Sequence, residues 1–133
     1  RGLGDVYKRQ IKYIENIISS TNTSHVPIIY YSRCKSNFDM LKDMGIDCVG
    51  ISSDNNLRDI YQSLDKKIAV QGNFNPDILR EDKSLIKKEV VRTLESFPYE
   101  SGHVFNLGSG ITPDIDPDKV SFLVEQVHEI SSK

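Results

Sequence analysis

Short apolar stretches that alternate with amphipathic helical stretches constrain this chain more than any other feature. The apolar stretches are residues 26–31, 48–51, 68–70 and 103–105. Around them apolar residues recur at helical spacing, which predicts one helix before the first strand and one helix after each strand. Continuous apolar strands that alternate with such helices are typical of a parallel sheet whose outer face is covered by helices.

The helix ends are indicated by residues that favour caps. We expect Asp54 or Asn55, Asp82 and Asp116 to cap the helices that follow them, since a side-chain oxygen there accepts from a free backbone amide. Gly45 is expected to end a short helix, because glycine adopts the left-handed conformation found after many helices.

The inward faces of the helices follow from the spacing of their apolar residues. The predicted buried stripes are Ile11, Ile14, Ile17 and Ile18; Phe38, Leu41 and Met44; Leu57, Ile60, Tyr61 and Leu64; Ile86, Val90, Leu94 and Phe97; and Val120, Leu123, Val124 and Val127.

Two architectures fit this order of elements. One is a small doubly wound sheet, and the other is half of an eight-stranded (β/α) barrel, which typically needs about 250 residues. A length of 133 residues suits one domain in either case. Because Gly2 and Gly4 should interrupt a helix, we expect residues 1–10 to be a non-native leader and residues 11–133 to form the domain.

Charge and composition exclude several classes of partner. The net charge of −2 and the pI near 5.9 give no reason to expect nucleic acid or an anionic membrane. No apolar stretch approaches the roughly 20 residues of a membrane span. No signal peptide is visible, and Cys34 and Cys48 lack metal-site spacing, so we expect reduced cysteines and a cytoplasmic protein without a metal.

Ligands of such sheets bind beyond the carboxyl ends of the strands, where four polar clusters fall. They are residues 32–34, 52–54, 71–76 and 106–114. Arg33 either binds a carboxylate of a ligand or is a solvated loop residue. Asp54 is either a general base or a helix cap. Gln71 and Asn73 either orient a ligand or satisfy loop backbone. The three histidines, His25, His103 and His128, are expected to be structural, and no Gly-x-Gly-x-x-Gly motif or P-loop supports a nucleotide cofactor.

The same clusters, taken in order, resemble the C-terminal half of the uroporphyrinogen decarboxylase family. Residues 26–31 (VPIIYY) are similar to the family's "VPVILF", and residues 44–50 (MGIDCVG) to "xGxDxxG". Residues 69–76 (AVQGNFNP) resemble "ALQGNLDP", and residues 102–111 (GHVFNLGSGI) resemble "GHVFNLGHGI". Residues 116–128 are similar to the final "PPEHV…FVEAVH" helix.

The resemblance implies the C-terminal half of a (β/α)8 barrel, with four parallel strand-helix units. It also implies a homodimeric enzyme that removes four acetate carboxyls of uroporphyrinogen as carbon dioxide, without a metal or organic cofactor. The family's aspartate that holds the pyrrole NH groups and its carboxylate-binding arginines belong to the first half, so no catalytic residue is expected here and the chain alone should be inactive.

One substrate contact is implied within this sequence, at Ser109, where the family motif has histidine. Serine is a shorter, uncharged donor. An alternative within the superfamily is a corrinoid-linked zinc methyltransferase with a His-x-Cys motif after the strand that corresponds to residues 26–31. Cys34 occupies the first cysteine position, but Ser32 replaces the histidine and Ser109 the second cysteine. A truncated half-barrel without function is the remaining alternative.

Overall fold

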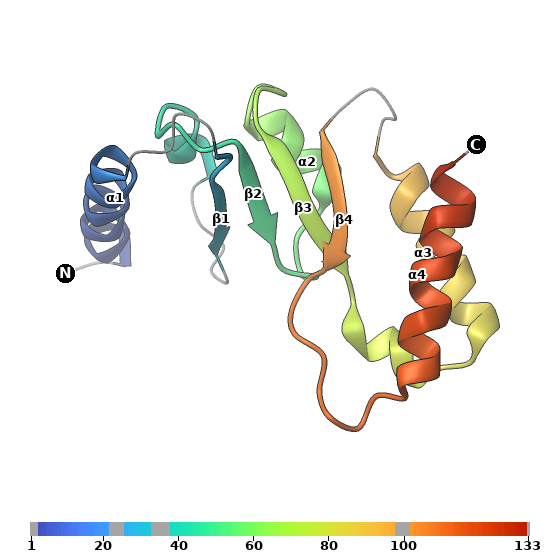
Figure 1. Ribbon diagram of the computed structural model, residues 1–133. Helices are drawn as coiled ribbons and strands as arrows, with labels where there is room; N and C mark the ends of the chain where they lie inside the picture. The colour runs from blue at the N-terminus through green and yellow to red at the C-terminus, as the bar shows by residue number, and fades with distance from the viewer. Residues whose placement is uncertain (1–2, 22–25, 33–37, 98–101, 133) are drawn as a thin grey trace.

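The structure, a computed structural model, describes residues 3–21, 26–32, 38–97 and 102–132 (Figure 1). The elements in chain order are α1 (Leu3–Ser20), β1 (Ile29–Ser32), the 3₁₀ turn η1 (Phe38–Leu41), β2 (Cys48–Ile51), α2 (Leu57–Ser63), β3 (Ala69–Phe74), the 3₁₀ turn η2 (Pro76–Arg80), α3 (Lys83–Glu95), β4 (His103–Leu107) and α4 (Pro117–Ser131).

The four strands form one sheet in the order β1-β2-β3-β4, and every neighbouring pair is parallel. A doubly wound sheet reverses its strand order part-way, and this sheet does not. Sequential parallel strands joined by right-handed crossovers place all their helices on the same face. The fold is therefore the predicted half of a (β/α)8 barrel, with four parallel strand-helix units.

The two faces of the sheet differ in how they are covered. Along β3, Val70, Gly72 and Phe74 are buried on the helix side, while the residues between them are half-buried. On the opposite face, Tyr31 is 44% exposed and Val104 is 45% exposed. In a closed barrel that face lines the interior; here it is open.

Two apolar clusters fill the space between the sheet and the helices. The first joins α1, η1 and α2 to β1, β2 and β3, and its centre includes Leu41, Val49 and Leu64. The second joins η2, α3 and α4 to β3 and β4, around Phe74 and Ile86. Figure 1 shows the same division, with α1 beside β1 at one end of the sheet and α3 next to α4 at the other. Complete burial of each large side chain contributes about 1.5–3 kcal/mol.

Several predicted boundaries agree with the structure. Strand β2 covers the predicted residues 48–51. Asp82 accepts a hydrogen bond from the Leu85 amide at 2.9 Å, and Asp116 accepts from the Asp118 amide at 2.9 Å, so both cap their helices as expected. Gly45 has a φ of +72°, the left-handed conformation predicted for it, although the short helix that it was expected to end already ends at Leu41.

The ends of several other elements were predicted wrongly, including that of β4, which ends at Leu107, two residues later than predicted. Helix α1 already begins at Leu3 and includes Gly4, since one glycine costs a helix only about 1 kcal/mol. Asn56, rather than Asp54 or Asn55, caps α2, through its Oδ1 and the amides of residues 58 and 59 at 2.9 and 3.2 Å.

Strand β3 continues to Phe74, so the polar residues 71–73 belong to the strand instead of following it. Strand β1 begins only at Ile29, three residues later than predicted. The short helix after β1 is the 3₁₀ turn η1, and its predicted cap, Asn37, lies outside the described residues.

Two predicted stripe residues are exposed. Ile17 on α1 is 63% exposed and Val124 on α4 is 48% exposed, although their stripe neighbours Ile14, Ile18 and Leu123 contact the core. Within the described ranges, no helix combines the length and apolar character that crossing a bilayer requires.

Candidate functional site

A cavity of about 360 Å³ lies on the open face of the sheet, at the carboxyl ends of its strands. We call it the Ser109 cavity. Its lining residues are Tyr31, Gly50, Ile51, Gln71, Asn106, Leu107, Ser109 and Gly110. The structure therefore brings Ser109 and Gln71, both predicted from sequence, into one cavity.

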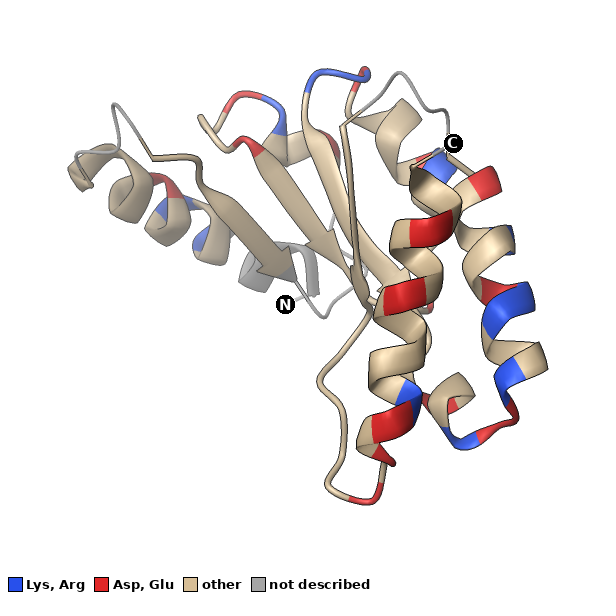
Figure 2. Ribbon diagram, turned by 45° about the vertical axis from the view of Figure 1, so that its right-hand side comes forward, with Lys and Arg blue, Asp and Glu red and all other residues tan. Residues whose placement is uncertain are grey.

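The lining of the Ser109 cavity combines apolar surface with uncharged polar groups. No Lys, Arg, Asp or Glu is among its lining residues, and none occurs within the four strands. Figure 2 shows the same separation, with charged residues on helices and connecting loops while the strands carry none. Such a lining can contact apolar parts of a ligand and form hydrogen bonds with its polar atoms.

The turn that carries Ser109 is fixed at its first residue, Gly108. The Gly108 amide donates to the Phe74 carbonyl at 2.8 Å, and the Gly108 carbonyl accepts from the Tyr31 hydroxyl at 2.9 Å. A Cβ at Gly108 would lie 2.3 Å from the Ser53 nitrogen. Glycine is thus required there because the loop after β2 approaches closely.

Arg80 fixes the far end of the same loop. Its Nε donates to Asp114 at 3.0 Å, one terminal nitrogen donates to Thr112 at 2.8 Å, and the other pairs with Asp77. Lys119 donates to the Arg80 carbonyl at 2.9 Å. Asp114 is ion-paired with Arg80, and a hydrogen bond with Thr112 and then one with Arg80 lower the pKa of its carboxyl group.

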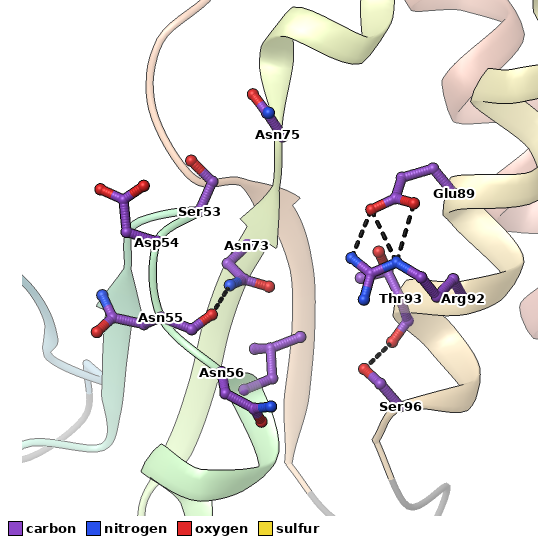
Figure 3. Close-up of a pocket in the computed structure, with 11 residues that line it drawn as sticks. Ser53, Asp54, Asn55, Asn56, Asn73, Asn75, Glu89, Arg92, Thr93 and Ser96 are labelled. Carbon is purple, nitrogen blue, oxygen red and sulfur yellow. Dashed lines mark hydrogen bonds and ion pairs between the residues drawn. The ribbon is translucent and has the colours of Figure 1, made fainter.

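A second, polar cleft of about 280 Å³ separates the start of α2 from α3 (Figure 3). Its lining residues are Ser53, Asp54, Asn55, Asn56, Leu57, Asn73, Asn75, Glu89, Arg92, Thr93 and Ser96. In Figure 3 Asn73 points from β3 toward Asn55, whose carbonyl accepts its amide hydrogen bond, and Glu89 and Arg92 pair on the opposite wall.

The polar groups of this cleft mainly satisfy one another. Asn73 also donates to the Ser52 carbonyl at 3.3 Å, which is the backbone-satisfying role foreseen as its alternative. Glu89 raises the pKa of Arg92 through a hydrogen bond, so the arginine is already paired. Asp54 is exposed and does not cap α2, and the one other carboxylate that lines the cleft, Glu89, is paired with Arg92.

Neither of the two described histidines lines the Ser109 cavity. His103 Nε2 lies 2.8 Å from the Gly72 carbonyl, and its ring lies 4.8 Å from that of Phe97. Burial lowers the pKa of His103. His128 is exposed near the end of α4. His25, Arg33 and Cys34 lie outside the described residues, and within those described no three metal-binding side chains converge.

Tyr31 is one of the cavity residues that sequence reasoning missed, together with Gly50 and Ile51. It was counted among the buried residues of its strand, whereas the structure places it on the open face. In the structure Tyr31 pairs with Gly50 across β1 and β2, and a glycine opposite an aromatic residue leaves room for the ring to lie over the sheet, but the sequence alone does not give this register.

Comparison with known proteins decides the family. The family model described as "Uroporphyrinogen decarboxylase (URO-D)" matches residues 5–130. The chain belongs to the uroporphyrinogen decarboxylase family. The uroporphyrinogen decarboxylase of Legionella pneumophila strain Corby is 33% identical over 124 residues, which are 91% of this chain and 35% of the relative. The enzyme of Pseudomonas putida is 34% identical over 128 residues, or 92% of this chain and 36% of the relative.

This member of the uroporphyrinogen decarboxylase family spans about a third of the length of those curated relatives. Among solved structures, a methyltransferase from Methanosarcina mazei superposes with a TM-score of 0.78 at 18% identity, over 97% of this chain and 38% of the methyltransferase. At that identity the likeness shows the fold alone, and it agrees with the half-barrel.

Proposed function

We propose that this chain forms part of a uroporphyrinogen decarboxylase and supplies one wall of its substrate cavity. The reaction is the loss of four acetate carboxyls as carbon dioxide, giving coproporphyrinogen, in a cytoplasmic homodimer that uses no cofactor. The observation that carries the proposal is the family match across residues 5–130, together with a cavity at the strand ends that contains Ser109.

The Ser109 hydroxyl is the proposed substrate contact. Ser109 is exposed at the cavity, and Gly110 beside it has no atom within 4 Å of a Cβ placed on it, so a bulky ligand can approach the turn. The hydroxyl would donate toward a carboxylate or a pyrrole group of the tetrapyrrole, directly or through water.

The chain on its own is proposed to lack decarboxylase activity. Decarboxylation of this substrate needs a group that protonates a pyrrole ring and cations that hold its carboxylates. No cation is present among the lining residues of the Ser109 cavity, because all of them are uncharged. Incubating the purified chain with uroporphyrinogen and separating the products by chromatography tests this. Coproporphyrinogen above the uncatalysed level would contradict it.

The role of Ser109 is tested by Ser109→Ala in a whole decarboxylase that contains this sequence. A hydrogen bond to a charged group contributes on the order of 1.5–3 kcal/mol, so we expect kcat/KM to fall roughly ten- to a hundredfold. The matched control is Ser121→Ala on the exposed side of α4, which should leave kcat/KM unchanged. If Ser109→Ala lowers only the melting temperature and keeps the wild-type kcat/KM, Ser109 is structural.

A further inference from the structure

Tyr31 reaches over the open face of the sheet to the turn that follows β4, which itself lies close to the ends of β2 and β3. It belongs to the edge strand β1, yet its hydroxyl donates to the carbonyl of Gly108, which directly follows the opposite edge strand β4, at 2.9 Å. The two residues are 77 positions apart in the chain. This hydrogen bond joins β1 to the turn after β4 at the mouth of the Ser109 cavity.

Gly50 provides the room that this arrangement needs. It is paired with Tyr31 in the neighbouring strand β2, and a Cβ on it would lie 2.9 Å from Tyr31 Cδ2 and 3.3 Å from Tyr31 Cβ. Any larger residue would push the ring away from the sheet. The direction of the ring, and with it the position of the hydroxyl, therefore depends on the absence of a side chain at residue 50.

The hydrogen bond from Tyr31 acts on the residue that immediately precedes Ser109. The Gly108 amide is held by β3 through Phe74, and the loop is held again at Thr112 by Arg80. Residues 109–111 lie exposed between these attachments. Without the Tyr31 hydroxyl, the Gly108 carbonyl loses the partner that fixes the peptide plane leading into Ser109.

We infer that Tyr31 is a positioning residue that orients Ser109 toward the tetrapyrrole through the Gly108 carbonyl. The choice of a tetrapyrrole as the ligand rests on the proposed function, whereas the hydrogen bond from Tyr31 to Gly108 does not depend on it. Tyr31 acts through Ser109, so removing its hydroxyl changes ligand binding only while the Ser109 hydroxyl is present. A residue that merely stabilised the sheet would change binding equally in both backgrounds.

The geometric part is tested in the 133-residue chain by amide hydrogen exchange at Gly108. Tyr31→Phe should speed this exchange about fivefold, as expected for the loss of a hydrogen bond worth about 1 kcal/mol. Gly50→Ala, which keeps the hydroxyl but displaces the ring, should have a similar effect. The matched control is Tyr30→Phe, because Tyr30 packs against the helix-side core and does not line the cavity. Unchanged exchange in Tyr31→Phe overturns the inference.

The functional part is tested with uroporphyrin III, the stable oxidised tetrapyrrole, by fluorescence anisotropy. Tyr31→Phe should weaken its binding about fivefold in the wild-type background and less than twofold in Ser109→Ala. Equal weakening in both backgrounds overturns the coupling through Ser109. The wild-type chain could bind no uroporphyrin while amide hydrogen exchange at Gly108 still becomes faster in Tyr31→Phe. That result would refute the proposed substrate site and support the conclusion that the Tyr31 hydroxyl fixes the turn at Gly108.

Discussion

Replacing Gly108 by alanine should destabilise the fold far more than the same change two residues later. The new Cβ would lie 2.3 Å from the Ser53 nitrogen and 2.9 Å from the Ser53 Cα. Ordinary contacts between such atoms are about 3.5 Å or longer, so the two backbones must separate by about 1 Å. The loop around Ser53 cannot simply retreat, because Asn73 is hydrogen-bonded to the carbonyls of Ser52 and Asn55.

The expected cost has two parts. Forcing extra atoms into a packed region costs about 1–3 kcal/mol. Moving Gly108 also weakens its hydrogen bonds to Phe74 and Tyr31, each worth about 1 kcal/mol. We therefore expect Gly108→Ala to lower the free energy of unfolding by about 2–4 kcal/mol.

Gly110→Ala is the matched control, since a Cβ at Gly110 has no atom within 4 Å and its φ lies outside the left-handed region. This change should be neutral or stabilise by about 0.4–1 kcal/mol, through reduced freedom of the unfolded chain. Urea unfolding followed by circular dichroism compares the three proteins. If the two variants differ by less than about 0.5 kcal/mol, the close approach of Gly108 to Ser53 does not constrain the fold and the reasoning fails.

Three further outcomes are expected. Burial lowers the pKa of His103 below its ordinary value of 6.5, so below about pH 6.5 the unfolded chain binds a proton at this residue more readily than the folded chain does. The free energy of unfolding should therefore fall as the pH drops below about 6.5. Urea titrations should show that this pH dependence is reduced in His103→Gln and retained in His128→Gln. Asn56→Ala should lower the free energy of unfolding by about 1 kcal/mol through loss of the α2 cap, while Asp54→Ala should change it little in the same assay. The unpaired edges of β1 and β4 and the exposed Ile29 and Val104 should make the chain associate in sedimentation experiments, and a monodisperse monomer at all concentrations would contradict this.

The sequence predicted the elements whose signals are local. Strand 48–51 lies in the middle of the sheet, where a continuous apolar run is buried on both faces, and its predicted ends are correct. Asp82 and Asp116 cap their helices through backbone amides only two or three residues away, so nearby residues decide the geometry. The half-barrel itself was chosen by the family resemblance, since periodicity left two architectures open.

The errors concern positions that distant parts of the chain determine. Ile17 and Val124 have the spacing of core residues, but they lie on the outermost helices, and no further helix in the described ranges packs over them. Residues 71–73 are polar and were expected to follow β3, yet pairing with β4 extends the strand through them. Tyr31 could be placed in the cavity only with knowledge of its partner Gly108 across the sheet.

The sequential order of the strands has a consequence for synthesis on the ribosome. Each strand pairs with the one made immediately before it, from β1 with β2 to β3 with β4. A strand that leaves the exit tunnel therefore finds its partner already made and does not wait for a segment still to be translated. Loop closure between such neighbours costs little entropy, so assembly can proceed stepwise from the amino terminus. The last bond in this series is that from Tyr31 to Gly108, which forms only after β4 has been added.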